Sequence, residues 1–424
     1  MESREPTAPL SEGGGREPVS QARGLGFHRS TPPGAAAIAL FEVFGDEAPR
    51  ALARLFRARA GSLPAPGEAR FGEVADTSGN AIDEAVLAHV PEGASWSRLE
   101  SWALSVHGGP WIQTAVARAL EALGARELSR REVLARAVAL GRLDGPAAAA
   151  YELLVEARTP RAAKFFLRQY SGEFSRRVRE AVSLTGRGDA EGAGRIVREL
   201  LEGSARALRL SEPLRILLAG RPNAGKSTLF NLLAGEERTA VAPVPGTTRD
   251  AIEAVTAIEG YPVELTDSAG IRPLEGLDAI EREGVRRALA RPYDAVLYLI
   301  PHPWVRDASD REFLERAPPE RRLVLATFAD LAQRGERPEA DLRVSAVSGE
   351  GIADLRRTIV LRWLDGREGP PEDVPCAAFD RRLVERLERA SRHLERAGAR
   401  DLDAAREALV ESLAWGMSGI DGGP

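Results

Sequence analysis

The chain has 424 residues, of which 43% are hydrophobic and 29% charged, and its formal net charge is −5. This length allows two or three domains with full hydrophobic cores, and the small net charge excludes a global attraction to nucleic acid or to membranes. The single cysteine, Cys376, excludes an internal disulfide and fits the reducing conditions of a cytoplasmic protein.

The first half of the chain divides into three zones. Residues 1–26 are rich in Gly, Pro, Glu and Arg without an apolar segment, which predicts a disordered extension rather than a signal peptide. Residues 27–109 contain short apolar stretches broken by Gly and Pro, a pattern that predicts an α+β domain with several strands. Residues 110–211 carry Ala, Leu, Arg and Glu at helical spacing and predict the first part of a helical domain.

The second half predicts a nucleotide-binding domain followed by more helix. In residues 212–365 strands alternate with helices, as in α/β domains. The apolar run at residues 295–301 has the length of a core strand, and no run approaches the roughly 20 residues of a membrane span, so we expect no membrane partner. Residues 366–424 begin with a Pro- and Gly-rich linker and return to amphipathic helix, which predicts a truncated second part of the helical domain. The predicted fold class is therefore α/β and α, with an N-terminal α+β domain and a helical domain interrupted by an inserted α/β domain.

A phosphate-binding loop is the strongest motif of the inserted domain. Residues 220–227 read GRPNAGKS and satisfy the pattern GxxxxGK[ST], between an apolar strand and the start of a helix. Glycines let successive backbone amides face one centre, where the helix terminus favours negative charge. Lys226, one of two lysines in the chain, would lie on the β- and γ-phosphates. The predicted nucleotide-binding residues of this segment are Asn223, Ala224, Gly225, Lys226, Ser227 and Thr228.

Two later segments supply the metal and switch residues of a GTPase. Residues 244–250, VPGTTRD, are similar to switch I, in which Thr248 would complete the Mg²⁺ shell when the γ-phosphate is bound. The strand YPVELTD then ends in DSAG, where Asp267 would hold Mg²⁺ through water and the Gly270 amide would sense the γ-phosphate. With the hydroxyl of Ser227, the predicted Mg²⁺ ligands are Ser227, Thr248 and Asp267.

The base-recognition motif departs from the usual Asn-Lys-x-Asp. Here the strand RRLVLAT leads into Thr327, Phe328, Ala329 and Asp330, so the acceptor for guanine N–H groups is kept. Thr327 lacks the amide of asparagine, and Phe328 offers apolar cover without charge. A loss of one or two hydrogen bonds at about 1–3 kcal/mol each predicts guanine affinity roughly 10–1000-fold weaker, with a residual preference through Asp330. The supporting loop, as in related sites, would contain Ser345 and Ala346.

The four motifs GRPNAGKS, PGTTRD, DSAG and SAVSGEG together resemble the GTPase domain of the TrmE/MnmE family of tRNA modification GTPases. The resemblance continues outside that domain, with TPPG at residues 31–34, HGGP at residues 107–110, GRLD at residues 141–144 and LRQYSGEFS at residues 167–175. These segments follow the family's order over nearly the whole chain beyond its N-terminal tail. The resemblance implies that the inserted α/β domain is a Ras-like P-loop GTPase domain.

The resemblance implies a catalytic apparatus of potassium, Lys226 and Glu281. In the family a potassium ion neutralises charge between the β- and γ-phosphates, and a glutamate matched by Glu281 orients the attacking water. The alternative for Glu281 is an exposed glutamate in the first turn of a helix. The implied potassium ligands are Asn223, Ala242, Val244 and Thr247.

The resemblance also implies partners, and some residues argue against part of them. The family acts on tRNA wobble uridines with a flavin-dependent MnmG-like partner subunit, forms a homodimer through its N-terminal domain and binds 5-formyl-tetrahydrofolate. The family's folate-contacting arginine falls here on Glu42 and an acid on Ala103, and only the basic position at Arg142 is kept, so we expect weak folate binding. The family's terminal Cys-x-Gly-Lys motif has no counterpart before the chain stops, and Cys376 does not map onto it.

Three hypotheses for function therefore stay open. The first is a GTPase with Mg²⁺ and K⁺ that acts in tRNA wobble-uridine modification. The second is a divergent paralogue that serves as a nucleotide switch without tRNA chemistry, which the altered folate positions favour. The third is a non-hydrolysing nucleotide-binding scaffold, against which the retained phosphate and Mg²⁺ residues argue.

Overall fold

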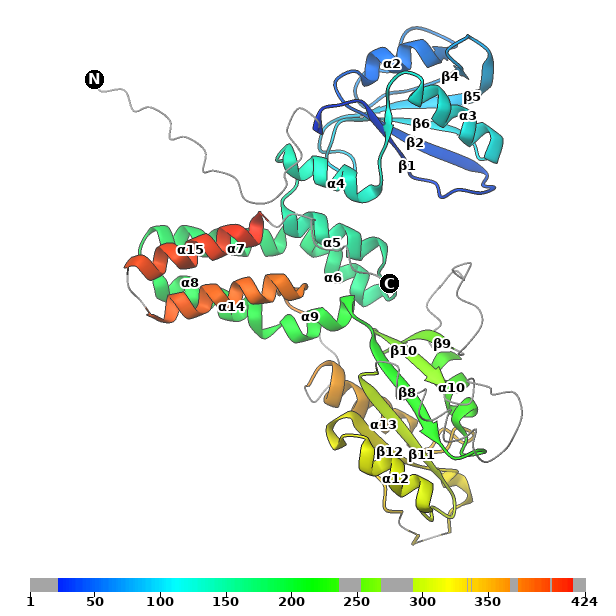
Figure 1. The fold of residues 1–424 in the computed structure, drawn as a ribbon, viewed down its shortest axis with the longest axis vertical. Coiled ribbons are helices and arrows are strands. Elements are labelled where there is room, and N and C mark those ends of the chain that lie inside the picture. The colour runs from blue at the N-terminus through cyan, green and yellow to red at the C-terminus, as the bar shows by residue number, and fades with distance from the viewer. Residues whose placement is uncertain are drawn as a thin grey trace. The chain divides into compact units, whose positions relative to one another are not determined.

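The computed structural model describes residues 22–235, 253–267, 293–333, 335–336, 338–366, 373–396 and 399–414. The chain forms two compact units, Met1–Glu152 with Glu411–Pro424, and Leu153–Val410. Figure 1 shows their helices and strands as a ribbon. Among the described residues, no helix is both long enough and apolar enough to cross a membrane.

A seven-stranded sheet in the order β3-β4-β5-β6-β2-β1-β7 forms the first unit. Neighbouring strands are antiparallel except β1 and β7, which run parallel. Along β5 the buried residues Ala85, Leu87 and His89 alternate with more exposed ones, so one face of the sheet covers the core. The strands are β1 (Gly26–Arg29), β2 (Ile38–Phe44), β3 (Phe56–Ala58), β4 (Ala69–Ala75), β5 (Ala81–Val90), β6 (Ser101–His107) and β7 (Arg126–Glu127).

Two helices cover that face of the sheet. Helices α2 (Ala48–Leu55) and α3 (Pro110–Glu121) bury their apolar side chains in one cluster with the strand residues. Helix α3 and strand β7 lie beyond the boundary that we expected at residue 109, so the sheet domain is longer than its composition suggested. It also starts earlier, because Ala22 is buried and β1 begins at Gly26. Helices α4 (Arg130–Ala139) and α5 (Gly145–Val155) follow.

The nucleotide-binding domain of the second unit has a six-stranded sheet in the order β13-β12-β11-β8-β10-β9. All neighbours are parallel except β9, which pairs antiparallel with β10. The central strands β8 and β11 are buried along almost their whole length, as expected for parallel strands covered on both faces. The strands are β8 (Leu214–Gly220), β9 (Glu253–Ile258), β10 (Tyr261–Asp267), β11 (Ala295–Pro301), β12 (Arg322–Thr327) and β13 (Leu342–Arg343). The helices are α10 (Lys226–Gly235), α12 (Ala308–Arg316), α13 (Ile352–Ile359), the short η2 (Pro319–Arg321) and η3 (Ala329–Leu331), and the π-helix η4 (Val360–Leu364).

Helices from before and after this domain pack together (Figure 1). Helix α8 lies against α7 on one side and α14 on the other, and the segment before α14 buries Phe379 against Phe165, Phe166 and Phe174. The helical domain is therefore interrupted by the nucleotide-binding domain, which confirms the predicted fold class. Its helices are α6 (Pro160–Tyr170), α7 (Glu173–Gly186), α8 (Ala190–Glu202), α9 (Ser204–Ser211), α14 (Arg381–Arg396) and α15 (Ala399–Leu413).

Candidate nucleotide site

The phosphate-binding loop joins the carboxyl end of β8 to α10, in the middle of the six-stranded sheet. Strand β8 has β11 on one side and β10 on the other, so the strand order reverses there. Ligands of open α/β sheets bind beyond the carboxyl ends of the strands at such a reversal. The predicted loop therefore lies where the topology favours a ligand.

The loop backbone requires glycine where it leaves the sheet. Gly220 has φ of +140°, and a Cβ atom there would lie 2.4 Å from the carbonyl oxygen of Leu299 on β11. Gly225 (φ +89°) and Asn223 (φ +60°) also adopt positive φ. Asparagine tolerates this region better than most residues, so the sequence agrees with the turns that it makes.

Lys226 is buried at the start of α10. Its ammonium donates to the carbonyl oxygens of Gly220 and Arg221, each at 2.7 Å. Only 8% of the residue is exposed, so the flexible side chain is confined above the loop. The phosphate-binding loop therefore carries a buried positive charge at its own carbonyl oxygens.

Ser227, at the start of α10, lies beside Asp267, the last residue of β10. The Ser227 hydroxyl donates to Oδ2 of Asp267 at 2.8 Å, and Asp267 is 2% exposed. Strand pairing places Asp267 beside Leu218 of β8, so the sheet itself sets this distance. A hydroxyl and a carboxylate are oxygen donors of the kind that Mg²⁺ prefers, and the pair fits the predicted metal. The described residues contain no cluster of three or more His, Cys, Asp or Glu that could hold a metal, and this pair would need further oxygens.

Thr327 ties the base-recognition loop to the phosphate-binding loop. Its hydroxyl donates to the carbonyl oxygen of Ala224 at 2.8 Å and lies 3.3 Å from that of Ile300. Thr327 therefore makes a polar link to the phosphate loop although it lacks the amide of asparagine.

Phe328 and Asp330 follow Thr327 in the base-recognition loop. Phe328 adopts a left-handed backbone (φ +59°), and its ring lies 3.5 Å from the position of a Cβ atom on Gly225. Asp330 is exposed, so its carboxylate is free to accept from a ligand. An apolar ring beside the loop and an exposed acid beyond it are the features that a purine base would need there.

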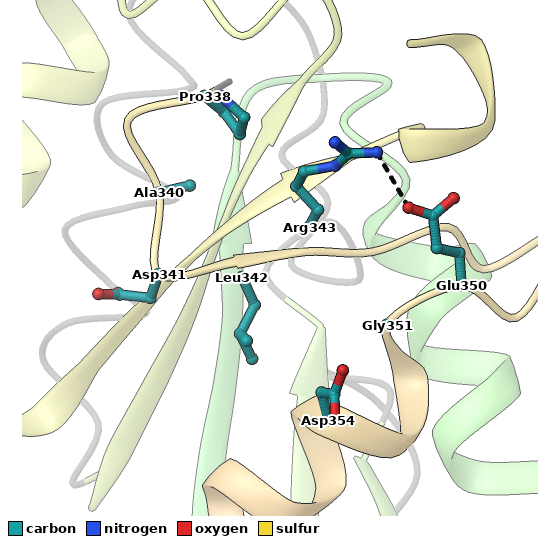
Figure 2. A pocket seen from close by; sticks show the side chains of 8 residues that line it. All are labelled: Pro338, Ala340, Asp341, Leu342, Arg343, Glu350, Gly351 and Asp354. Carbon is teal, nitrogen blue, oxygen red and sulfur yellow. Dashed lines mark hydrogen bonds and ion pairs between the residues drawn. The ribbon is translucent and has the colours of Figure 1, made fainter. Parts of the chain in front are cut away.

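The supporting loop is hydrogen-bonded around the buried Ser345. The Ser345 hydroxyl accepts from the backbone N–H groups of Val347 and Ser348, at 3.3 and 3.1 Å, and the residue is 1% exposed. Ala346 is half-buried next to it, whereas Val347 is 79% exposed. Outside this loop, Arg343 and Glu350 pair across a pocket that is lined by residues around β13 and the start of α13 (Figure 2).

Several predicted residues lie outside the described part of the chain. They are Ala242, Val244, Thr247, Thr248, Gly270 and Glu281. Two residues that the sequence did not suggest contact the site: Arg221, the second residue of the loop, and Trp304, which follows β11. Arg221 pairs with Asp307, 86 positions away, and such long-range partners leave no local signal in a sequence.

The predicted folate positions lie in the first unit. Glu42 is 6% exposed and accepts from the hydroxyl of Ser30 at 3.0 Å and the indole N–H of Trp96 at 2.7 Å. Arg142 pairs with Glu92 at 2.7 Å on the surface. The side chains at these two positions thus have partners within the protein, and one of them is a buried acid.

Comparison with known proteins gives a consistent picture. Residues 215–327 match the model of the 50S ribosome-binding GTPase family, and residues 27–142 match that of the GTP-binding protein TrmE N-terminus. The chain is 36% identical over 412 residues to the tRNA modification GTPase MnmE of Thermus thermophilus, covering 90% of this chain and 91% of that protein. The MnmE proteins of Methylibium petroleiphilum (33% over 438 residues, 91% of both chains) and Halorhodospira halophila (33% over 404 residues, 87% and 84%) are similar.

Proposed function

Because the chain belongs to the MnmE family of tRNA modification GTPases, we propose that its phosphate-binding loop holds GTP for hydrolysis and that this hydrolysis is part of tRNA wobble-uridine modification. As a family member it binds GTP and is a GTP hydrolase. The observation that supports this site best lies at one end of the sheet. There the buried Lys226 is followed by Ser227, whose hydroxyl donates to Asp267. The reaction forms a bond from a water oxygen to the γ-phosphorus and breaks the bond to the β–γ bridging oxygen, giving GDP and phosphate.

In this proposal the protein works by position and charge. The loop amides and the Lys226 ammonium neutralise the phosphate oxygens as negative charge moves to the leaving GDP. Glu281 orients the attacking water. Ser227, Asp267 and Thr248 would hold Mg²⁺, which when bound would supply positive charge to neutralise the phosphate oxygens. Asn223, at its positive φ in the loop, would hold K⁺ with Ala242, Val244 and Thr247.

Base recognition in this proposal combines one acid with one aromatic ring. Asp330 accepts from guanine N–H groups, and the ring of Phe328 covers the base where other GTPases place the stem of a lysine. Ser345 and Ala346 complete the loop behind the base. Stacking on an aromatic ring does not distinguish purines, so the preference for guanine rests on the Asp330 carboxylate.

The partners are proposed from the family alone. They are tRNA, a flavin-dependent partner subunit similar to MnmG, and a second copy of the chain through the N-terminal domain. Glu42 specifically favours the second candidate, a divergent nucleotide switch without tRNA chemistry, because a buried acid occupies the position of the family's folate-contacting arginine. Folate affinity is therefore expected to be weak, and calorimetry with 5-formyl-tetrahydrofolate measures it.

A hydrolysis assay on the purified chain tests the proposal. We compare GTP with ATP, first in potassium and then in sodium, with Asp330→Ala as the specificity variant. The expected result is potassium-stimulated turnover of GTP over ATP, with the preference reduced about 10- to 100-fold in Asp330→Ala because a charged hydrogen-bond acceptor is lost. Equal turnover of both nucleotides by the unaltered chain would refute guanine recognition, and equal rates in sodium would refute the potassium site.

Restoration of wobble-uridine modification in cells that lack their own family member separates the two candidate functions. Restoration supports the tRNA function. GTP hydrolysis without restoration supports the nucleotide switch.

A further inference from the structure

The segment at residues 301–310, which comprises the last residue of β11, the connection to α12 and the first turn of α12, contacts both halves of the nucleotide site. On the phosphate side it meets Arg221, the second residue of the phosphate-binding loop. The guanidinium of Arg221 donates to the carbonyl oxygen of Val305 at 2.9 Å and to Oδ2 of Asp307 at 3.2 Å. Its Nε lies 3.3 Å from Oδ2 of Asp310.

Asp310 provides a fixed end for this contact. It is fully buried, and its second oxygen accepts from the Tyr298 hydroxyl at 2.8 Å. It also accepts from the backbone N–H of Asp307 in the capping box of α12. A buried carboxylate needs such partners, and the Arg221 charge is one of them. The carbonyl of Arg221 in turn accepts from Lys226, the residue that the proposed function places on the phosphates.

On the base side the same connection holds Thr327. The indole N–H of Trp304 donates to the carbonyl oxygen of Thr327 at 2.9 Å, and the backbone N–H of His302 donates to the same oxygen at 3.2 Å. The hydroxyl of Thr327 donates to Ala224 of the phosphate-binding loop. Thr327 is therefore fixed from two directions immediately before Phe328 and Asp330.

Trp304 is itself held in place. Its backbone is left-handed (φ +60°), a conformation that a bulky residue keeps only where its surroundings enforce it. Its ring packs edge-on against His302 at 5.0 Å, and the Arg343 guanidinium lies 5.7 Å from its centre. Arg343 is fixed by its ion pair with Glu350, which Figure 2 shows.

We propose that residues 301–310 act as a brace that positions both loops of the guanine-nucleotide site, the phosphate-binding loop through Arg221 and the base-recognition loop through Trp304 and Thr327. Arg221 and Trp304 are positioning residues. This inference rests on the proposed function, because it concerns how that site selects guanine nucleotides.

The two ends of the brace predict different defects. Trp304→Phe keeps an aromatic ring and removes the indole N–H, so Asp330 should lose alignment with the base. We expect the affinity of Trp304→Phe for GDP to fall about threefold to tenfold. The loss of affinity for inosine diphosphate should be smaller, because this ligand lacks the 2-amino group that Asp330 would bind. The preference for GDP over inosine diphosphate therefore falls in Trp304→Phe.

Trp363→Phe is the matched control for this variant. Its indole N–H also donates to a backbone carbonyl, that of Glu320 at 3.0 Å, in the same domain but away from the two loops. Both affinities should stay unchanged in this control. Melting temperatures of both variants identify any general loss of stability.

The phosphate end is tested by Arg221→Met combined with Asp310→Asn, which removes the charge pair without leaving an unpaired buried carboxylate. This double variant should lower the affinities for GDP and for inosine diphosphate by the same factor and leave the ratio of the two affinities unchanged.

The brace is overturned if Trp304→Phe is folded, has the melting temperature of Trp363→Phe, and still shows the unaltered chain's ratio of GDP to inosine diphosphate affinity. It is equally overturned if the double variant changes that ratio. A chain that binds neither diphosphate when unaltered would refute the proposed function instead.

Discussion

Thr327 illustrates how a residue that departs from a motif can still make a hydrogen bond to the phosphate-binding loop. An asparagine at this position would offer two donors and one acceptor, and threonine offers one hydroxyl. That hydroxyl reaches Ala224 at 2.8 Å because the last residue of β12 and the phosphate-binding loop lie side by side at the carboxyl ends of the strands. The residue type predicted a loss, whereas the position allowed one bond to remain.

His107 gives a prediction about pH at the residue scale. Its ring nitrogen lies 2.8 Å from the Asp83 carboxylate on the surface of the first unit, and this hydrogen bond raises the pKa of His107 above its usual 6.5. Because the folded-state pKa is the higher one, the contribution of the pair to stability is complete below about pH 6.5 and is lost as the pH rises through the folded-state pKa. A pH titration of the His107 ring by NMR should give a midpoint above 6.5, and in Asp83→Asn the midpoint should fall. The same midpoint in both proteins would contradict the assignment.

The phosphate-binding loop carries the prediction at the scale of an element. In Gly220→Ala the new methyl carbon would meet the Leu299 carbonyl oxygen at 2.4 Å, at a φ that alanine avoids. We expect a loss of about 1–3 kcal/mol of stability or more, together with loss of nucleotide binding, since β8 and β11 must separate. Urea unfolding and GDP binding measure the two effects.

Gly235→Ala is the control for this substitution. Gly235 lies at the end of α10 with nothing within 4 Å of the added carbon, and alanine is expected to be neutral or slightly stabilising there. If Gly220→Ala unfolded at the same urea concentration as the control, the steric argument would be wrong.

At the same scale, the sequence predicted the positions of helices and strands better than it predicted the domain to which each one belongs. The spacing of GxxxxGKS between apolar and helical segments sufficed to predict β8, the loop and α10. The composition of residues 110–127 is helical, but α3 buries Val116 and Leu120 against the first sheet, and β7 pairs with β1. Which surface a helix covers depends on partners far away in the chain, and helical periodicity alone does not contain that information. The contacts of Arg221 and Trp304 escaped prediction for the same reason.

At the scale of the whole molecule, a hairpin links the nucleotide-binding domain to the helical domain within the second unit. Tyr261, at the turn between β9 and β10, is fully buried, and its hydroxyl donates to Oδ2 of Asp365 at 3.1 Å. Asp365 also pairs with the buried Arg206 of α9, at 3.5 Å. The Arg161 guanidinium of α6 lies 4.8 Å from the Tyr261 ring centre. Strand β10 leads from this cluster directly to Asp267, so the junction and the metal ligand share one strand.

Tyr261→Phe tests the importance of this junction. Removal of the hydroxyl leaves Oδ2 of Asp365 without its donor in a buried setting, which should cost about 1–3 kcal/mol of stability. Because the nucleotide loops keep their own contacts, GDP affinity should stay within a factor of about two. Urea unfolding followed at several wavelengths, with GDP titration, gives both values. An unchanged unfolding midpoint would show that the hydrogen bond does not stabilise the junction.

The central claim is that the loop around Lys226 holds the phosphates of GTP, and the chain provides its own control because it has two lysines. Lys226→Ala removes the buried ammonium, whereas Lys164→Ala removes an exposed one that pairs with Asp373. Equilibrium dialysis with GTP and Mg²⁺ should show affinity reduced at least about 10- to 100-fold in Lys226→Ala and unchanged in Lys164→Ala. Equal retention of GTP by both variants would contradict the account.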